Sequence, residues 1–539
     1  MPSNMMYSYC FEARNIQQYI LEAGKLKDMV SASRLVDELC QFSGSCDLLQ
    51  KVLDAIPLAA TKVRFLRRAG GAFILLLDKK EDAIALQNLW TLVVTHYAPG
   101  LEWIDALGDE KLTEPEAVES CISKLLSRRN NPPVSLPEAS PFVQFSERTG
   151  RAGVNKGNDD WLDISTARKR KMNNGTEGTG HHFLPVLPEE DKRVYVWAQS
   201  FDPKEDGSER LMPFLEGVQP SLGVIHADGN GLGVALQSLQ AAAQRPDEYQ
   251  DIYWEFSCAI ATATRNAVQA ATKAILIPEA KQNGSVYILP ARPLVLGGDD
   301  ITIIVRGDLA LDYLNIFLQN FESETQKQLE FLHGVIPELP EKLTACGGVA
   351  FIKPTQPFLQ AYALAESLCA HCKKQPTNAE GLKPSSLAFY RVTTSSIGRY
   401  DTILKEIETY LYDRTYHKKT MGAYDVVDTS ASNLPRFSDL KKLHALFEVN
   451  GGPNKIFPSS YARKLLTEMS RAPQLVPQIY ARWRQMIKKG DPSDLIKFDE
   501  IMKRMGVDDP ARSPFTNVID AHCYTPLGDV VSLTSIMQK

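Results

Sequence analysis

No uninterrupted apolar stretch in this chain of 539 residues approaches the roughly 18 to 20 residues that a membrane-spanning helix needs. The first residues also lack the apolar core of a signal peptide. Neither sign of charge dominates, because 60 Lys and Arg against 65 Asp and Glu give a formal net charge of −5. We therefore expect a cytoplasmic protein with no membrane contact, in which any contact with RNA comes from local patches.

Paired cysteines are also scarce. The nine cysteines are scattered and odd in number, as is typical of reduced thiols in a cytosol. Cys369 and Cys372 have the spacing of half a zinc site, but no second pair exists and both fall on one apolar helix face, so we expect core packing. His181 and His182 carry little weight as metal ligands without carboxylate or cysteine partners at metal spacing.

The most informative motif is Gly297-Gly298-Asp299-Asp300, which lies between the apolar runs 293–296 and 301–305. The glycines stand where a hairpin must turn and suit a positive φ. Such a turn lifts two carboxylates to the edge of a sheet. The alternative is an ordinary hairpin turn, because Asp and Gly are the commonest turn residues.

A third carboxylate, Asp228, ends the apolar run 222–227 and precedes Gly229-Asn230-Gly231. If this strand lies beside the hairpin, Asp228, Asp299 and Asp300 can converge on two Mg²⁺ or Mn²⁺ ions and act as the catalytic residues. The small residues after Asp228, together with Gly297 and Gly298, would let a phosphate approach the backbone amides. A helix that begins after Gly233 adds favourable partial charge.

The order of elements predicts an α+β protein. Residues 222 to 374 read as strand, helix, hairpin, helix, strand and helix, which is the order of a ferredoxin-like palm domain. Residues 63–77 read as a second hairpin, with Gly70-Gly71 at its corner and no carboxylate there. From about residue 399 the chain turns helical, with Ile403, Ile407, Tyr410 and Leu411 at helical spacing.

These motifs resemble the large subunit of type III CRISPR effector complexes, whose second palm domain carries a GGDD motif, and more distantly the GGDEF diguanylate cyclases. The resemblance implies a palm that converts ATP into cyclic oligoadenylates. It also implies that Asp228, Asp299 and Asp300 bind metal and that Lys373, borne on a helix, holds a triphosphate. Asn230 stands where many members have a second acidic residue, which affects how a second metal would be held.

The N-terminal residues 16–20, 24–28 and 31–36 resemble the first palm helix of that family. The resemblance implies two palms in tandem, with a degenerate first palm at 1–125, an irregular insert at 126–215, the GGDD palm at 216–398 and a helical domain at 399–539. The degenerate palm would form a wall for a second nucleotide, with Ser33 and Arg34 as candidate contacts.

Two features of the family are missing from this sequence. No His-Asp dipeptide occurs, so we expect no HD nuclease module and no cleavage of single-stranded DNA. The segment 141–153, which contains Thr149-Gly150-Arg151, has no cysteine, so we expect no structural zinc there. The basic run 168–171 is interpreted as a solvated loop in preference to an RNA contact.

The sequence therefore predicts a nucleotidyltransferase that joins nucleoside triphosphates, with ATP favoured, into cyclic oligonucleotides through 3′-5′ bonds in antiviral signalling. Its expected partners are the nucleotide, guide or target RNA, other effector subunits and further copies of the chain. Two alternatives stay open, a non-catalytic scaffold subunit that binds RNA and protein, and a free-standing nucleotide cyclase. The base, the ring size and the activating signal are not determined by the sequence.

Overall fold

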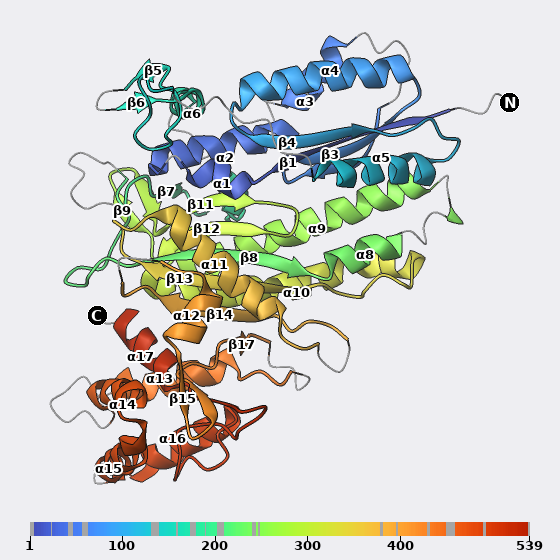
Figure 1. Ribbon diagram of the computed structural model, residues 1–539. Coiled ribbons are helices and arrows are strands. Elements are labelled where there is room, and N and C mark those ends of the chain that lie inside the picture. The colour runs from blue at the N-terminus through green and yellow to red at the C-terminus, as the bar shows by residue number, and fades with distance from the viewer. Residues whose placement is uncertain are drawn as a thin grey trace.

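The fold was analysed in a computed structural model (Figure 1). It describes residues 5–22, 24–40, 47–56, 63–130, 140–157, 160–172, 179–188, 190–201, 210–239, 244–245, 248–377, 381–394, 397–427, 432–448, 457, 459–488 and 492–536. The predicted α+β class is confirmed. Among these residues, no helix combines the length and the apolar character that crossing a membrane requires.

The N-terminal part forms a four-stranded antiparallel sheet with the order β2-β3-β1-β4. Its strands are β1 (Tyr7–Arg14), β2 (Arg64–Ala69), β3 (Ala72–Leu77) and β4 (Glu102–Leu107). Between β1 and β2 lie α1 (Ile16–Leu21), α2 (Leu26–Cys40) and α3 (Leu48–Ala55), and α4 (Lys80–Tyr97) joins β3 to β4. We call this part, with α5 (Glu114–Arg128), the first βαββαβ unit.

The central part forms a six-stranded sheet with the order β11-β12-β8-β13-β14-β17. Its strands are β8 (Leu222–Asn230), β11 (Ala291–Leu296), β12 (Ile301–Arg306), β13 (Thr344–Ile352), β14 (Ser386–Arg391) and β17 (Tyr424–Asp425). Its helices are α8 (Leu232–Ser238), α9 (Tyr249–Ala271), α10 (Ala310–Val335) and α11 (Phe358–Lys373). The strands β8, β11, β12 and β13 repeat the order of the first sheet, and we call this part the second βαββαβ unit.

The two units pack directly against each other, and Figure 1 shows the first above the second. Helix α9 contacts β2, and α2 contacts β11. On this interface the Gln250 side chain donates to the Phe65 carbonyl at 2.7 Å, and the rings of Phe65 and Trp254 lie 6.3 Å apart. Because β11 begins the hairpin that carries Asp299 and Asp300, the first unit lies next to the candidate site.

The segment between the units has more regular structure than predicted. It contains β5 (Asn155–Lys156), β6 (Trp161–Leu162), α6 (Ile164–Lys171), α7 (Gly180–Phe183) and β7 (Val194–Trp197). Strand β7 pairs in parallel with β10 (Val286–Leu289), which also pairs with β9 (Lys281–Asn283). Helix α6 begins at Asp163, whose side chain accepts from the Ser165 and Thr166 amides.

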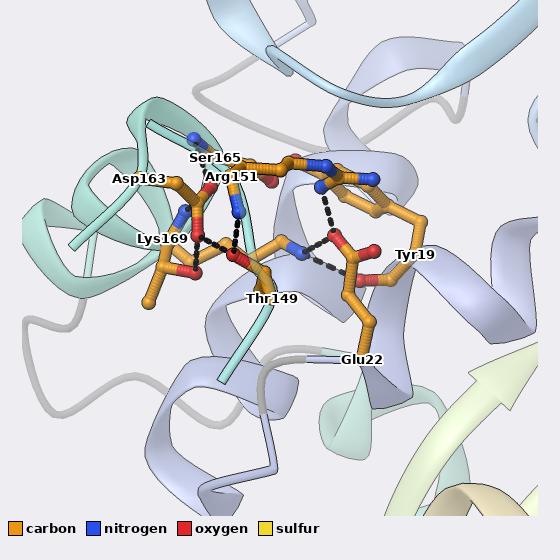
Figure 2. A network of polar contacts seen from close by, with 8 residues as sticks. Tyr19, Glu22, Thr149, Arg151, Asp163, Ser165 and Lys169 are labelled. Atoms are coloured by element: carbon orange, nitrogen blue, oxygen red, sulfur yellow. Dashed lines mark hydrogen bonds and ion pairs between the residues drawn. The ribbon is translucent and has the colours of Figure 1, made fainter. Parts of the chain in front are cut away.

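The basic run on α6 is not a solvated loop, and that prediction was wrong for Lys169. Its side chain is fully buried, and its ammonium donates to the Tyr19 carbonyl at 2.6 Å and lies 3.3 Å from the Glu22 carboxylate (Figure 2). Arg151 also pairs with Glu22, at 3.0 Å. The charge is buried because α6 packs on α2 and brings the lysine over the carboxylate that ends α1.

The C-terminal part is mainly helical, but it also contains strands. Its helices are α12 (Tyr400–Glu406), α13 (Phe437–Glu448), α14 (Ser459–Arg471), α15 (Val476–Lys488), α16 (Pro492–Arg504) and α17 (Leu527–Ile536). A sheet of β15 (Thr409–Tyr412), β16 (Thr415–Lys418) and β18 (His522–Tyr524) lies among them. The helix predicted through Tyr410 and Leu411 was wrong, because Asp413 and Arg414 at positive φ close a two-residue hairpin there.

Candidate active site

Two neighbouring strands bring the three predicted carboxylates to one edge of the second sheet. The Gly297 amide donates to the Asp300 carbonyl at 2.8 Å and closes the turn between β11 and β12. In the pairing of β12 with β8, Ile301 lies opposite Ala227, so Asp228 comes next to the turn. Asp299 packs on the backbone after Asp228, since a Cβ on Gly229 would lie 2.8 Å from its Oδ2.

The two glycines of this turn do not adopt a positive φ, so that part of the prediction was wrong. A Cβ on Gly297 would lie 1.6 Å from Oδ1 of Asp300, so glycine leaves room for that carboxylate. A Cβ on Gly298 would meet no atom within 4 Å. Gly298 therefore faces open space, and Thr264 on α9 holds it there by donating to its carbonyl at 2.8 Å.

The three carboxylates crowd one another, and Asp299 and Asp300 are partly buried. Burial, and then the neighbouring charge of Asp228, raises the pKa of Asp299 to about 7 and that of Asp300 to about 6. Gln17 of the first unit donates to Oδ2 of Asp300 at 3.0 Å. Arg67, also from the first unit, opposes the rise of both pKa values. The cluster is therefore more stable when it holds a cation or a proton.

Lys373 is the last residue of α11 and lies at the same edge. Its ammonium is 2.5 Å from Oδ2 of Asp228 and donates to the Gly229 carbonyl at 2.8 Å. Burial opposes its charge, but the charge of Asp228 and the hydrogen bond to that carboxylate together raise the pKa of Lys373. His226 lies on β8, two residues before Asp228. Burial lowers the pKa of its imidazole to about 4, so this side chain is neutral beside the cluster.

Other predicted residues have different surroundings. The amide of Asn230 donates to Thr344 Oγ1 at 3.0 Å and is buried, so it serves the pairing of β8 with β13. Gly231 has a φ of +80° and precedes α8. Ser33 lies 2.9 Å from the hydroxyl of Thr179. Arg34 instead pairs with Glu38 on its own helix, at 2.6 Å.

A pocket of about 110 Å³ lies between the units, next to the carboxylates. It is lined from the first unit by Gln17, Ser33, Asp37, Arg67, Gly70 and Gly71, and from the second by 294–300. A neighbouring pocket of about 270 Å³ shares Gly70, Leu296 and Gly297 and adds Trp254 and Arg265. The two hairpin corners meet between them, since a Cβ on Gly70 would lie 3.2 Å from the Gly298 nitrogen.

Sequence reasoning missed Gln17, Arg67 and Thr264. Gln17 and Asp300 are 283 residues apart, and no spacing in the sequence links them. The Gly70-Gly71 corner and the resemblance of residues 16–36 pointed to a wall of the site. Of the two side chains named for that wall, Ser33 lines the pocket and Arg34 does not. Cys369 and Cys372 are free and buried, which confirms their predicted packing in the core.

No family model matches the chain, and no curated protein sequence matches it. The solved Csm1-Csm4 cassette in complex with cA3 contains a chain of similar fold, with a TM-score of 0.51 and 15% identity, over 99% of this chain and 69% of that chain. The same values describe the cassette in complex with one ATP. Csm1 in T. onnurineus has a TM-score of 0.46 and 12% identity, over 99% of this chain and 70% of that chain. The resemblance expected from the sequence is thereby confirmed at the level of the fold.

Proposed function

We propose that this chain is a twin-palm nucleotidyltransferase that joins ATP into cyclic oligoadenylates, as a large subunit of a type III CRISPR effector complex in antiviral defence. In this proposal the two βαββαβ units are the palms, and the second is the catalytic one. One observation carries it: the two hairpin corners meet at Gly70 and Gly298, and only the second corner carries carboxylates. The likeness in fold to cassettes in complex with cA3 and with ATP supports it.

The donor set fits Mg²⁺ or Mn²⁺. Asp228, Asp299 and Asp300 offer only hard oxygen ligands. The raised pKa values of Asp299 and Asp300 reflect a negative charge that a divalent ion would neutralise. These three residues would hold the ions. When bound, such ions activate a 3′-hydroxyl and neutralise the triphosphate.

The remaining chemistry is positioning and electrostatics by the chain itself. Lys373 would move from Asp228 to the β- and γ-phosphates, because a metal-bound Asp228 has less charge to offer its ammonium. The open space at Gly298 leaves room for phosphate oxygens. From the first unit, Arg67 and Gln17 reach the same pocket and would orient the second nucleotide.

The sizes and lining residues of the two pockets support a placement for the parts of the nucleotide. The pocket at the carboxylates, of about 110 Å³, is smaller than the roughly 300 to 1,000 Å³ of typical ligand sites. The neighbouring pocket contributes Trp254, on whose ring a base can stack, and Arg265. We therefore place the base and sugar in the neighbouring pocket and the phosphates at the carboxylates.

The test is to incubate the protein with each labelled nucleoside triphosphate and Mg²⁺ or Mn²⁺, with and without candidate RNA, and to identify the products by mass spectrometry. We expect ATP-derived cyclic products with 3′-5′ linkages that are absent from the double variant Asp299→Asn, Asp300→Asn. Products made equally well without RNA or partner subunits would favour a free-standing cyclase. No turnover of any nucleotide in the assembled complex would overturn the proposal and favour a scaffold.

A further inference from the structure

Helices α2 and α7 bring together three metal-ligating side chains that are far apart in the sequence. Asp37, His181 and His182 each offer one ligand atom, and these atoms all lie within 4.8 Å of one another. We propose that they form a site for Zn²⁺ or a similar transition-metal ion, separate from the three-aspartate cluster. Two imidazoles and a carboxylate are a ligand set that zinc accepts, with a fourth position left for water.

The carboxylate of Asp37 is the strongest indication of a missing ligand. Asp37 is only 7% exposed, and its Oδ1 has no hydrogen-bond partner among the described residues. Its Oδ2 lies 3.4 Å from Nε2 of His182, and that nitrogen also lacks a hydrogen bond among those residues. Leaving buried polar atoms unpaired is costly, and a cation among the three ligands would satisfy them.

Helix α7 is held so that both imidazoles lie together. Trp197 donates through Nε1 to the Gly180 carbonyl at 3.0 Å, and a Cβ on Gly180 would lie 2.6 Å from the Trp197 ring. Gln269 on α9 donates to the His182 carbonyl at 3.1 Å. The ring centroids of His181 and His182 are 3.7 Å apart. The ligands are therefore largely in place before an ion binds, which lowers the cost of binding.

The site would join three parts of the molecule. Asp37 belongs to the first unit, the histidines belong to the insert, and Gln269 belongs to the second unit. A hydrogen-bonded pair of hydroxyls, Ser33 and Thr179, already links α2 to the insert. Asp37 and Thr179 also line the pocket that contains Asp299 and Asp300. A bound ion would thus fix the insert at the rim of this pocket.

The ligand chemistry separates this site from the aspartate cluster. Imidazole nitrogen suits zinc, cobalt, nickel and copper, whereas carboxylates alone suit magnesium and manganese. Cobalt(II) is a useful probe, because its visible absorption reports nitrogen ligands and tetrahedral geometry. The inference does not depend on the proposed nucleotidyltransferase activity, and binding is its readout.

The experiment uses the full chain without a polyhistidine tag, stripped by a chelator and dialysed. Calorimetric titration with Zn²⁺ and absorption titration with Co²⁺ should reveal one site per chain with micromolar or tighter affinity. His181→Ala, His182→Ala and Asp37→Asn should each weaken it by at least about tenfold, since three protein ligands define the site. His96→Ala, which removes an exposed histidine on α4, is the matched control and should leave the affinity unchanged.

The double variant Asp299→Asn, Asp300→Asn should keep the zinc site, which separates it from the proposed catalytic metals. Thermal melting of each metal-free variant shows whether it folds. If Asp37→Asn or His181→Ala folds and binds zinc as the parent does, the proposal is overturned. Binding only at millimolar zinc, or a site lost with Asp299 and Asp300, would overturn it as well.

Discussion

The two βαββαβ units share a strand order, and each turns its hairpin on a pair of glycines, but the two corners use glycine differently. Gly70 and Gly71 have φ angles of +62° and +75°, which residues other than glycine rarely adopt. Gly297 and Gly298 have no such angle, and instead leave space for the Asp300 carboxylate and for the pocket. The first corner requires glycine because its backbone has positive φ angles. The second corner requires glycine because a side chain at Gly297 would occupy the space of the Asp300 carboxylate.

Two lysines, Lys169 beside the first unit and Lys373 in the second, also make similar contacts in different surroundings. The ammonium of Lys169 binds the Tyr19 carbonyl and the carboxylate of Glu22, and that of Lys373 binds the Gly229 carbonyl and the carboxylate of Asp228. Lys169 is fully buried, and burial lowers its pKa, whereas the side chain of Lys373 is 31% exposed and its pKa is raised. We infer that the fully buried Lys169 stabilises the fold and that the partly exposed Lys373 serves the candidate site.

The largest expected effect tests this contrast at the second corner. Asp299→Asn with Asp300→Asn should lower nucleotide turnover by at least about a thousandfold, equivalent to about 4 kcal/mol, because neutral amides cannot hold the metal-bound triphosphate. The melting temperature should not fall, because the change also removes crowded charge. Pyrophosphate release measures turnover, and Asp78→Asn after β3 is the control. Turnover at the parental rate would show that the site is wrongly assigned.

At the buried Lys169 we expect a loss of stability without a loss of nucleotide binding. Lys169→Met should lower the free energy of unfolding by about 3 kcal/mol, because it removes a hydrogen bond to the Tyr19 carbonyl and, among the described residues, one of the two cations that pair with the Glu22 carboxylate. Nucleotide binding per folded molecule should be unchanged. Chemical denaturation measures the loss, and Lys171→Met, on the exposed end of the same helix, should cost nothing. Equal stability of the two variants would contradict a structural role for this buried charge.

For Lys373 the expected change is in binding. Lys373→Ala should weaken ATP binding by about 1.5 to 3 kcal/mol, the scale of a lost charge-assisted hydrogen bond, with little change in melting temperature. Calorimetry with a non-hydrolysable ATP analogue measures this. The control is Lys374→Ala, whose side chain is 63% exposed and pairs with Asp401. If the two variants bind equally well, Lys373 does not hold the triphosphate.

A matched pair of glycine substitutions separates the two corners. Gly70→Ala should destabilise the protein by about 1 to 2 kcal/mol, because its φ of +62° is left-handed and the new Cβ would lie 3.2 Å from the Gly298 nitrogen. Gly298→Ala should leave stability unchanged and weaken nucleotide binding, because its Cβ points into open space. Thermal melts and binding titrations of both variants test this. Equal losses of stability would erase the distinction between the corners.

The smallest expected effect concerns pH. The lowered pKa of Lys169 means that the folded state loses this proton before the unfolded state does, so the group adds stability as pH rises toward its ordinary pKa of 10.5. The difference in stability between the parent and Lys169→Met should therefore widen between about pH 8 and about pH 10. Denaturation at the two pH values measures it. A difference that narrows would show that burial does not depress this pKa.

Much of the fold could be predicted from periodicity and turn residues. The strands around Asp228 and around the Gly-Gly-Asp-Asp turn, and the helices α10 and α11, all have apolar residues at the spacing their structure requires. The strand β15 was mistaken for a helix, because Tyr410 and Leu411 continue by chance the helical spacing of Ile403, which lies in α12, and of Ile407, which ends it. Short elements carry too few residues for the period to be decided.

The residues of the candidate site also divide into those that the sequence could identify and those that it could not. Asp228, Asp299, Asp300 and Lys373 were named from local motifs and a family resemblance, and the structure brings them to one edge. Gln17 and Arg67 could not be named, because their place in the pocket depends on how one unit packs on the other. Asn230 was named, but its amide is taken up by Thr344 in a strand pairing that local sequence does not show.

The sequence by itself determined which residues carry charge at the end of a strand and which segments can bury an apolar face, because these depend on neighbours along the chain. Only the tertiary structure decided that Gly70 meets Gly298, that Lys169 is buried against Glu22, and that Asp37 faces two histidines about 145 residues away. These contacts follow from the packing of the two units and the insert. That packing is decided by burial summed over whole surfaces, and no single motif in the sequence records such a sum.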